Sequence, residues 1–336
     1  MTVLPPAAAG AVLGAGEYLL GALWLVVIVL ALGFGAWRLR ALALPAWTGA
    51  PARLAESVLG VFGVIALGEL LGSFGLFTAP AMLVVSLVLA GLCALGGRRN
   101  RQRFEARGPA DDPAPPDPGS GRPGLSGRAG AWISVAALAA LAAGWAVPTL
   151  GALAAGMDRA DSLWYHMPLS AEFVQSASTT GLHYFDPIFF AVFYPANSEL
   201  LHAIPILGFE RDFVSPFLNI GFLGIGLLAC WCIGRPFGVA PQSLLAGSLV
   251  LGSQSLIEFQ AGESLNDIVG VAVVLAAGAL LVNGFMALRA GGAAPAPGRE
   301  PEAVPGRERY PSRGLREGGS QADVRGHGQE PAADHG

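Results

Sequence analysis

The 336-residue sequence contains no lysine, only three cysteines and few charged residues. Charged residues make up 13% of the chain, whereas soluble domains carry about 25%, so the composition excludes a water-soluble globular protein. All 20 basic residues are arginine and the net charge is −4, so no basic patch indicates nucleic-acid binding. This lysine-free composition, rich in alanine, glycine and arginine, is typical of a GC-rich genome.

The three cysteines, Cys93, Cys230 and Cys232, all lie in apolar stretches. Disulfide frameworks pair cysteines in small extracellular domains, so no disulfide is expected here. Side chains two residues apart diverge on a helix, which argues against a metal site at Cys230 and Cys232. We interpret the cysteines as packing residues. The sequence therefore identifies no cofactor and no metal ligands, and a divalent metal ion stays an open alternative.

Long apolar runs dominate the chain once two polar, charged segments, residues 97–129 and 289–336, are set aside. A bilayer core about 30 Å thick needs roughly 20 apolar residues in a helix. Seven stretches reach this length, so the sequence predicts an all-α integral membrane protein with about seven transmembrane helices. The predicted spans are 18–37, 57–75, 79–96, 130–150, 213–233, 239–258 and 267–288.

Arginine positions orient these spans. Arginines follow the first, third, fifth and seventh spans, whereas residues 151–212 hold only Arg159 and Arg211 among several acidic residues. Loops rich in arginine stay in the cytoplasm. The sequence therefore predicts a multi-pass protein of the cell membrane, with its N-terminus and residues 151–212 outside and its C-terminus in the cytoplasm.

The polar segments also divide the chain. Residues 97–129 and 289–336 are rich in proline, glycine and charge, so they cannot bury enough apolar surface to fold alone. We predict a three-span N-terminal unit over residues 1–96 and a four-span unit with an outer loop over residues 130–288. A disordered cytoplasmic linker joins the two units, and a disordered cytoplasmic tail follows them.

The outer loop, residues 151–212, is long and mixes aromatic residues with charges and prolines. Met167–Gln175 is predicted to form an amphipathic helix on the membrane surface, with Met167, Phe173 and Val174 toward lipid. The simplest interpretation is an interfacial loop that anchors the bundle. Aromatic residues and histidines that suit this depth are Tyr184, Phe189, Phe190, Phe193, Tyr194, His183 and His202.

Two groups of carboxylates lie on the predicted outer face. Asp161 follows the fourth span, and Glu258, Glu263 and Asp267 precede the seventh. A carboxylate at an apolar boundary can act as a base. Asp267 is expected in the first turn of its helix, where the helix dipole favours an anion. Two carboxylate sites on one outer surface suit chemistry on a lipid-linked substrate.

Three motifs carry a family resemblance: ADSLWYHMP (160–168), YPANSELLH (194–202) and SLNDIVGVAVVLAA (264–277). They resemble the catalytic portion of GT-C class glycosyltransferases, polytopic enzymes that use polyprenyl-phosphate sugars as donors. The resemblance extends over residues 130–288 and is to bacterial members of the protein-mannosyltransferase and aminoarabinose-transferase type. It implies a bacterial inner or plasma membrane enzyme that glycosylates an envelope glycan, lipid or protein.

The resemblance also implies roles for individual residues. Asp161 matches the catalytic carboxylate of the family, and Asn266 with Asp267 matches a second acidic site. In the implied mechanism Asp161 takes the proton from an acceptor hydroxyl as its oxygen attacks the anomeric carbon, and the lipid phosphate leaves as an anion. Expected contacts of the substrate, with cations near the phosphate, are Arg159, Tyr165, His166, Tyr194, Asn197, Arg211, Glu263 and Asn266.

The chain departs from the family after its last span. Family members continue for several more spans, often with an outer C-terminal domain, whereas a polar segment follows residue 288 here. The resemblance therefore implies a truncated or frameshifted product, or a partner subunit that supplies the missing spans. The alternative function is a non-catalytic membrane protein, either a degenerate transferase fragment or a subunit that scaffolds or transports envelope lipids.

Overall fold

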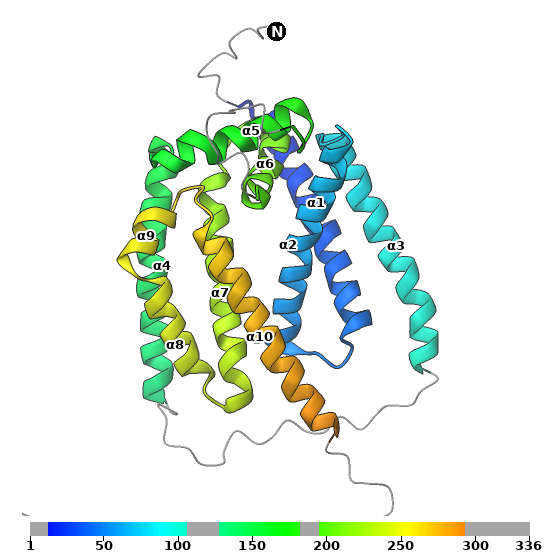
Figure 1. The fold of residues 1–336 in the computed structure, drawn as a ribbon, viewed down its shortest axis with the longest axis vertical. Coiled ribbons are helices and arrows are strands. Elements are labelled where there is room, and N and C mark those ends of the chain that lie inside the picture. The colour runs from blue at the N-terminus through cyan, green and yellow to red at the C-terminus, as the bar shows by residue number, and fades with distance from the viewer. Residues whose placement is uncertain (1–12, 106–127, 182–194, 293–336) are drawn as a thin grey trace, which may run out of the picture. The chain divides into compact units, whose positions relative to one another are not determined.

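The computed structural model describes residues 13–105, 128–181 and 195–292, and every regular element within these ranges is helical (Figure 1). The described residues belong to one compact unit that ends at Gly292. Most of the predicted linker and most of the predicted tail lie outside the described residues, as do Tyr194 and His183; the first four tail residues, 289–292, belong to the last helix. The first part of the predicted disordered linker is helical instead, because the third long helix continues to Glu105.

Six helices within the described ranges are long and apolar enough to cross a membrane. They confirm an all-α membrane protein with several spans, and they match six of the seven stretches predicted from the sequence. The six are α1 (Ala15–Ala43), α2 (Gly49–Ser73), α3 (Ala79–Glu105), α4 (Arg128–Ala155), α7 (Ser215–Gly234) and α10 (Asp267–Gly292).

The single helix predicted across residues 239–258 is not observed. Two shorter helices, α8 (Ala240–Leu251) and α9 (Gln254–Gln260), replace it. Together they return the chain from the end of α7 to the start of α10 (Figure 1). The indole Nε1 of Trp145 donates to the carbonyl of Leu251 at 3.1 Å, so a carbonyl next to the break keeps a buried partner.

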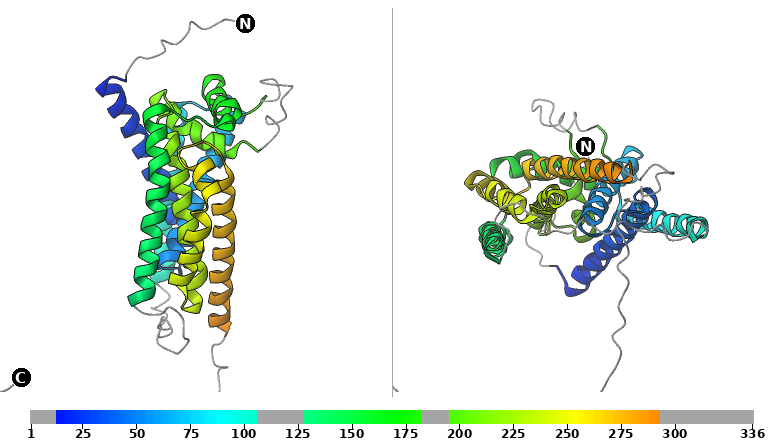
Figure 2. Two further views of the ribbon diagram at one scale, coloured as in Figure 1. Left: turned by 90° about the vertical axis from the view of Figure 1, so that its left-hand side faces the viewer. Right: turned by 90° about the horizontal axis from the view of Figure 1, so that it is seen from below.

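Two further helices lie across one end of the bundle (Figures 1 and 2). They are α5 (Met167–Ser176) and α6 (Asn197–Phe209), and both are too short to span a bilayer. Helix α4 ends there, and α7 and α10 begin there. We call this the loop end of the bundle.

Helix α5 occupies the stretch predicted as an amphipathic surface helix, but one of its predicted lipid contacts is wrong. Phe173 is fully buried in a core cluster with Ile28, Leu67 and Leu200. An amphipathic pattern identifies an apolar face without saying whether lipid or protein covers it. Here protein covers it, so α5 ties the N-terminal helices to the later ones.

Helix α6 links the two largest core clusters. Leu200 packs with residues of α1, α2, α3 and α5, whereas Leu201 packs with residues of α4, α7, α8 and α10. Helix α1 also approaches α6 very closely at Gly21. A Cβ atom at Gly21 would lie 2.6 Å from the carbonyl oxygen of Gly208. The N-terminal three-span segment therefore packs directly against the helix at the centre of the loop end.

Replacing Gly21 by alanine should destabilise the protein, because the added Cβ meets backbone that cannot rotate away. We expect a loss of about 1–3 kcal/mol, the usual effect of overpacking, measured as a lower thermal unfolding midpoint in detergent. The control is Gly33→Ala on the same helix, where no atom lies within 4 Å of the new Cβ. Since alanine favours helix by about 1 kcal/mol over glycine, this control should unfold no earlier than wild type. Equal midpoints for the two variants would contradict the close contact.

Candidate functional site

The chain leaves α4 and forms a short π-helical turn, η1 (Ser162–His166), before α5 begins. The amide of Met167 donates to the carbonyl of Ser162, the wide hydrogen-bonding pattern of a π-turn. Such turns occur frequently at functional sites. Ser162, His166 and Ser170 follow one another at helical spacing, so they share a face, and all three are buried. Asp161 immediately precedes this turn.

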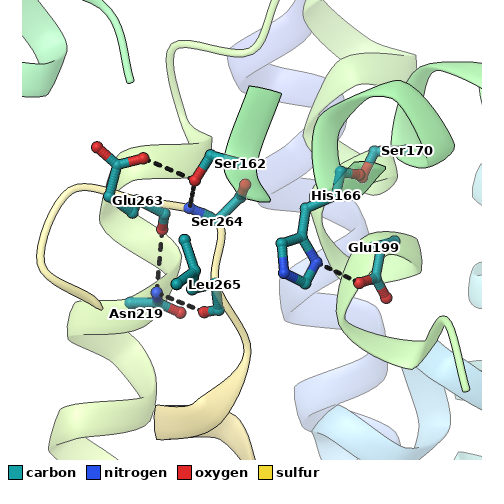
Figure 3. Close-up of polar contacts among 8 residues, drawn as sticks. All are labelled: Ser162, His166, Ser170, Glu199, Asn219, Glu263, Ser264 and Leu265. Atoms are coloured by element: carbon teal, nitrogen blue, oxygen red, sulfur yellow. Dashed lines mark hydrogen bonds and ion pairs between the residues drawn. The ribbon is translucent and has the colours of Figure 1, made fainter. Parts of the chain in front are cut away.

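The carboxylate of Glu263 fastens the start of this turn to the loop between α9 and α10 (Figure 3). The hydroxyl of Ser162 donates to Glu263 Oε2 at 2.6 Å, and the amide of Asp158 donates to Glu263 Oε1 at 3.2 Å. The Ser162 oxygen in turn accepts from the amide of Ser264 at 3.1 Å. Glu263 is 5% exposed. A buried carboxylate with both oxygens hydrogen-bonded holds two loops together.

Asn219 of α7 forms hydrogen bonds with the backbone of the same loop. Its Nδ2 lies 2.9–3.0 Å from the carbonyl oxygens of Gln260, Glu263 and Leu265. Gly262 allows the backbone of this loop to pass close to α4. Its φ is +80°, and a Cβ there would lie 2.8 Å from the Pro148 carbonyl oxygen. The loop is therefore held between α7 and α4 with little freedom to move.

Asp267 is the first residue of α10, as predicted, and it is exposed. Its Oδ2 accepts from Gln260 Nε2 at 2.8 Å, while Gln260 Oε1 accepts from the amide of Ile268 at 3.2 Å. The carbonyl of Asn266 accepts from the amides of Val269 and Gly270. The Asn266–Asp267 pair is thus fixed at the helix N-terminus, where the dipole favours the negative charge of Asp267.

A second buried carboxylate anchors the other end of the π-turn. Glu199 of α6 is 3% exposed and His166 is 1% exposed, and Glu199 Oε1 lies 2.5 Å from His166 Nδ1 (Figure 3). The ring of Tyr165 packs beside that of His166, with centroids 4.1 Å apart. Glu199 Oε2 is buried with no hydrogen-bond partner in the described part of the chain.

His202, one helical turn after Glu199, is 1% exposed rather than at the membrane interface as predicted. Its Nδ1 has no hydrogen-bond partner among the described residues. Burial, together with the charge of nearby His166, lowers the pKa of His202 to about 3. This imidazole is therefore neutral between pH 5 and 8.

Several predicted site residues face solvent at the loop end. Asp161 is exposed, and its carboxylate makes no hydrogen bond or ion pair with the described residues. Arg159 is partly exposed, with its guanidinium 5.0 Å from the Phe259 ring centroid and 3.7 Å from Glu258. Asn197 and Arg211 are also exposed, but no hydrogen bond or ion pair described for either reaches the π-turn.

The Ser162–Glu263 bond brings two predicted groups together: the segment with Arg159 and Asp161, and the segment with Asn266 and Asp267. Sequence reasoning missed Glu199 and Asn219. The available signal was their polarity: Asn219 interrupts the apolar run SPFLNIGFLGIG, and Glu199 lies in the first turn of the largely apolar helix NSELLHAIPILGF. Among the described residues, no group of three or more His, Cys, Asp or Glu side chains could hold a metal ion.

Comparisons with known proteins do not assign this arrangement to a family. No protein-family model, no curated protein and no solved structure matches the chain.

His202 should make the protein sensitive to acid. In the unfolded chain this histidine binds a proton below its ordinary pKa of 6.5, whereas the folded chain excludes that proton down to about pH 3. The unfolded state therefore binds more protons, so stability falls as the pH drops below 6.5. The loss at pH 5 is about 2 kcal/mol, from 1.36 kcal/mol per pKa unit.

The variant His202→Leu removes the imidazole that binds a proton in the unfolded chain, and with it the unpartnered Nδ1 of the folded chain. Its thermal midpoint should fall less than that of wild type between pH 7.5 and pH 5. If both proteins show the same pH dependence, His202 is not the buried neutral group described.

Proposed function

We propose that the protein is a membrane glycosyltransferase that moves a sugar from a polyprenyl-phosphate donor to an envelope acceptor outside the cytoplasm. The observation that supports this most is the setting of Asp161. This exposed carboxylate is without a partner among the described residues, yet it sits beside a π-turn anchored by two buried carboxylates, Glu263 and Glu199. A free base on a fixed support suits proton abstraction from a positioned acceptor.

The proposed step is an inverting displacement at the anomeric carbon. Asp161 takes the proton of an acceptor hydroxyl while that oxygen forms the new bond to the anomeric carbon. The bond from this carbon to the phosphate oxygen breaks, and its electron pair leaves with the polyprenyl phosphate. Since this leaving group is already a stable anion, the reaction needs no general acid, unlike the hydrolysis of ordinary glycosides.

The other exposed groups at the loop end have roles that fit this step. Arg159 stands two residues before Asp161, and its guanidinium, partly exposed and 3.7 Å from Glu258, is proposed to contact the donor phosphate. Asp267 contributes a second carboxylate, held on the adjoining segment by Gln260. Tyr165, Asn197 and Asn266, which are partly or fully exposed, are proposed to contact the sugar or the acceptor.

Replacing Asp161 by asparagine should sharply reduce the turnover of polyprenyl-phosphate sugars. Removing a positioned base costs about 10²–10⁴ in rate, so the loss should appear in kcat with purified protein and a panel of radiolabelled donors. Asp212→Asn is the matched control, because Asp212 is another exposed aspartate just before α7. Unchanged turnover in Asp161→Asn rejects the catalytic assignment. No turnover by wild type across the panel favours the alternative, a non-catalytic membrane protein.

The proposal requires the loop end to face away from the cytoplasm. Two exposed positions test this: Glu210 next to α6, and Phe237 in the turn η4 (Arg235–Phe237) between α7 and α8. With Cys93 replaced by serine, an impermeant maleimide should label Glu210→Cys on intact cells. It should label Phe237→Cys only after permeabilisation. The reverse pattern contradicts the proposed orientation.

A further inference from the structure

The Glu199–His166 pair is unusual for a structural contact. Burying a carboxylate and an imidazole together is expensive, and apolar residues of similar size often stabilise a protein as well or better. The pair lies in the protein interior: Leu200, the next residue, is fully buried in a core cluster, and His202, one turn after Glu199, is 1% exposed. Packing alone therefore does not explain why this pair stands between α6 and the π-turn.

The two carboxylate oxygens of Glu199 differ in their hydrogen bonding. Both carboxylate oxygens of Glu263 are hydrogen-bonded, as expected of a purely structural fastener. Glu199 uses Oε1 for His166, whereas its Oε2 is buried without a partner in the described part of the chain. A buried unpartnered carboxylate oxygen costs free energy. Such a cost is tolerated where the group serves a site.

The geometry connects this pair to Asp161. Glu199 holds Nδ1 of His166, so the second ring nitrogen lies on the side that faces Leu265 and the loop before α10 (Figure 3). A carboxylate on one imidazole nitrogen fixes the orientation of the ring. Because His166 ends the π-turn and Asp161 precedes it, fixing the ring also fixes the backbone that carries the proposed base.

We propose that Glu199 is a positioning residue for sugar transfer, acting through His166 to hold the π-turn, and thereby Asp161, in its productive place. This inference rests on the proposed function. Glu199 does not contact the substrate in this scheme, so its removal lowers kcat and leaves the KM for the donor nearly unchanged. Misplacing a base by about 1 Å is enough for a large loss of rate.

The test compares Glu199→Gln and Glu199→Leu with wild type in full-length protein. The amide oxygen of glutamine still accepts from Nδ1–H, whereas leucine cannot. We expect kcat to fall about 10-fold for Glu199→Gln and about 100-fold or more for Glu199→Leu, with the donor KM within about 3-fold of wild type. Glu210→Gln, an exposed glutamate at the end of the same helix, is the matched control and should keep its kcat.

A second readout does not depend on turnover. Hydrogen exchange of the amides of residues 162–167 should quicken about 10-fold in Glu199→Leu, less in Glu199→Gln and not at all in Glu210→Gln. If Glu199→Leu fails to fold, Glu199→Gln carries both readouts.

The outcomes separate the two proposals. Wild-type kcat in Glu199→Gln and Glu199→Leu, beside an inactive Asp161→Asn, overturns the positioning role and leaves the proposed function standing. A raised donor KM at unchanged kcat also overturns it, since it indicates a binding role. If Asp161→Asn is active, or wild type is inactive, the proposed function fails. Unchanged exchange at residues 162–167 then overturns the positioning of the turn as well.

Discussion

The side-chain amide of Asn219 is the interaction on which the rest of the loop end depends. Its NH₂ group has two hydrogens but lies within hydrogen-bonding distance of three carbonyl oxygens, so at least one hydrogen is shared. Those carbonyls belong to the loop that carries Glu263. Glu263 then holds Ser162, and Ser162 begins the π-turn beside Asp161. Each step uses a buried polar atom, so the position of an exposed residue is set from inside the bundle.

This arrangement follows from a general constraint on membrane proteins. Backbone polar groups away from water must find partners within the protein, so irregular backbone is tolerated only where other groups satisfy it. Asn219 does this for the loop before α10, and Trp145 does it at the break between α8 and α9. Both donors are side chains of long helices that pack against the irregular segments. The bundle therefore tolerates irregular backbone both in the loop before α10 and at the break between α8 and α9.

Local signals predicted much of this fold, and contacts between distant segments account for the rest. Long apolar runs predicted the six spanning helices, and an acidic residue before an apolar run placed Asp267 in a first turn. The break at Gly252 was missed because one apolar span was drawn through it, although the polar run Ser253–Ser255 follows this glycine directly. Glu199 was missed because its partner His166 is distant in the chain, and no local pattern predicts such a pairing.

Burial separates the four carboxylates of the loop end into two groups with different roles. Glu199 and Glu263 are buried and each accepts a hydrogen bond, whereas Asp161 and Asp267 are exposed at the loop end. Sequence position alone could not make this division, since all four lie in or at the edge of segments predicted to be outside. A buried, hydrogen-bonded carboxylate cannot take a proton from a substrate that it does not touch. It can, however, fix the backbone that carries an exposed carboxylate, and the exposed carboxylate can reach the substrate. The proposed base, Asp161, needs no hydrogen bonds of its own to stay in place, because the buried carboxylates Glu199 and Glu263 hold the turn beside it.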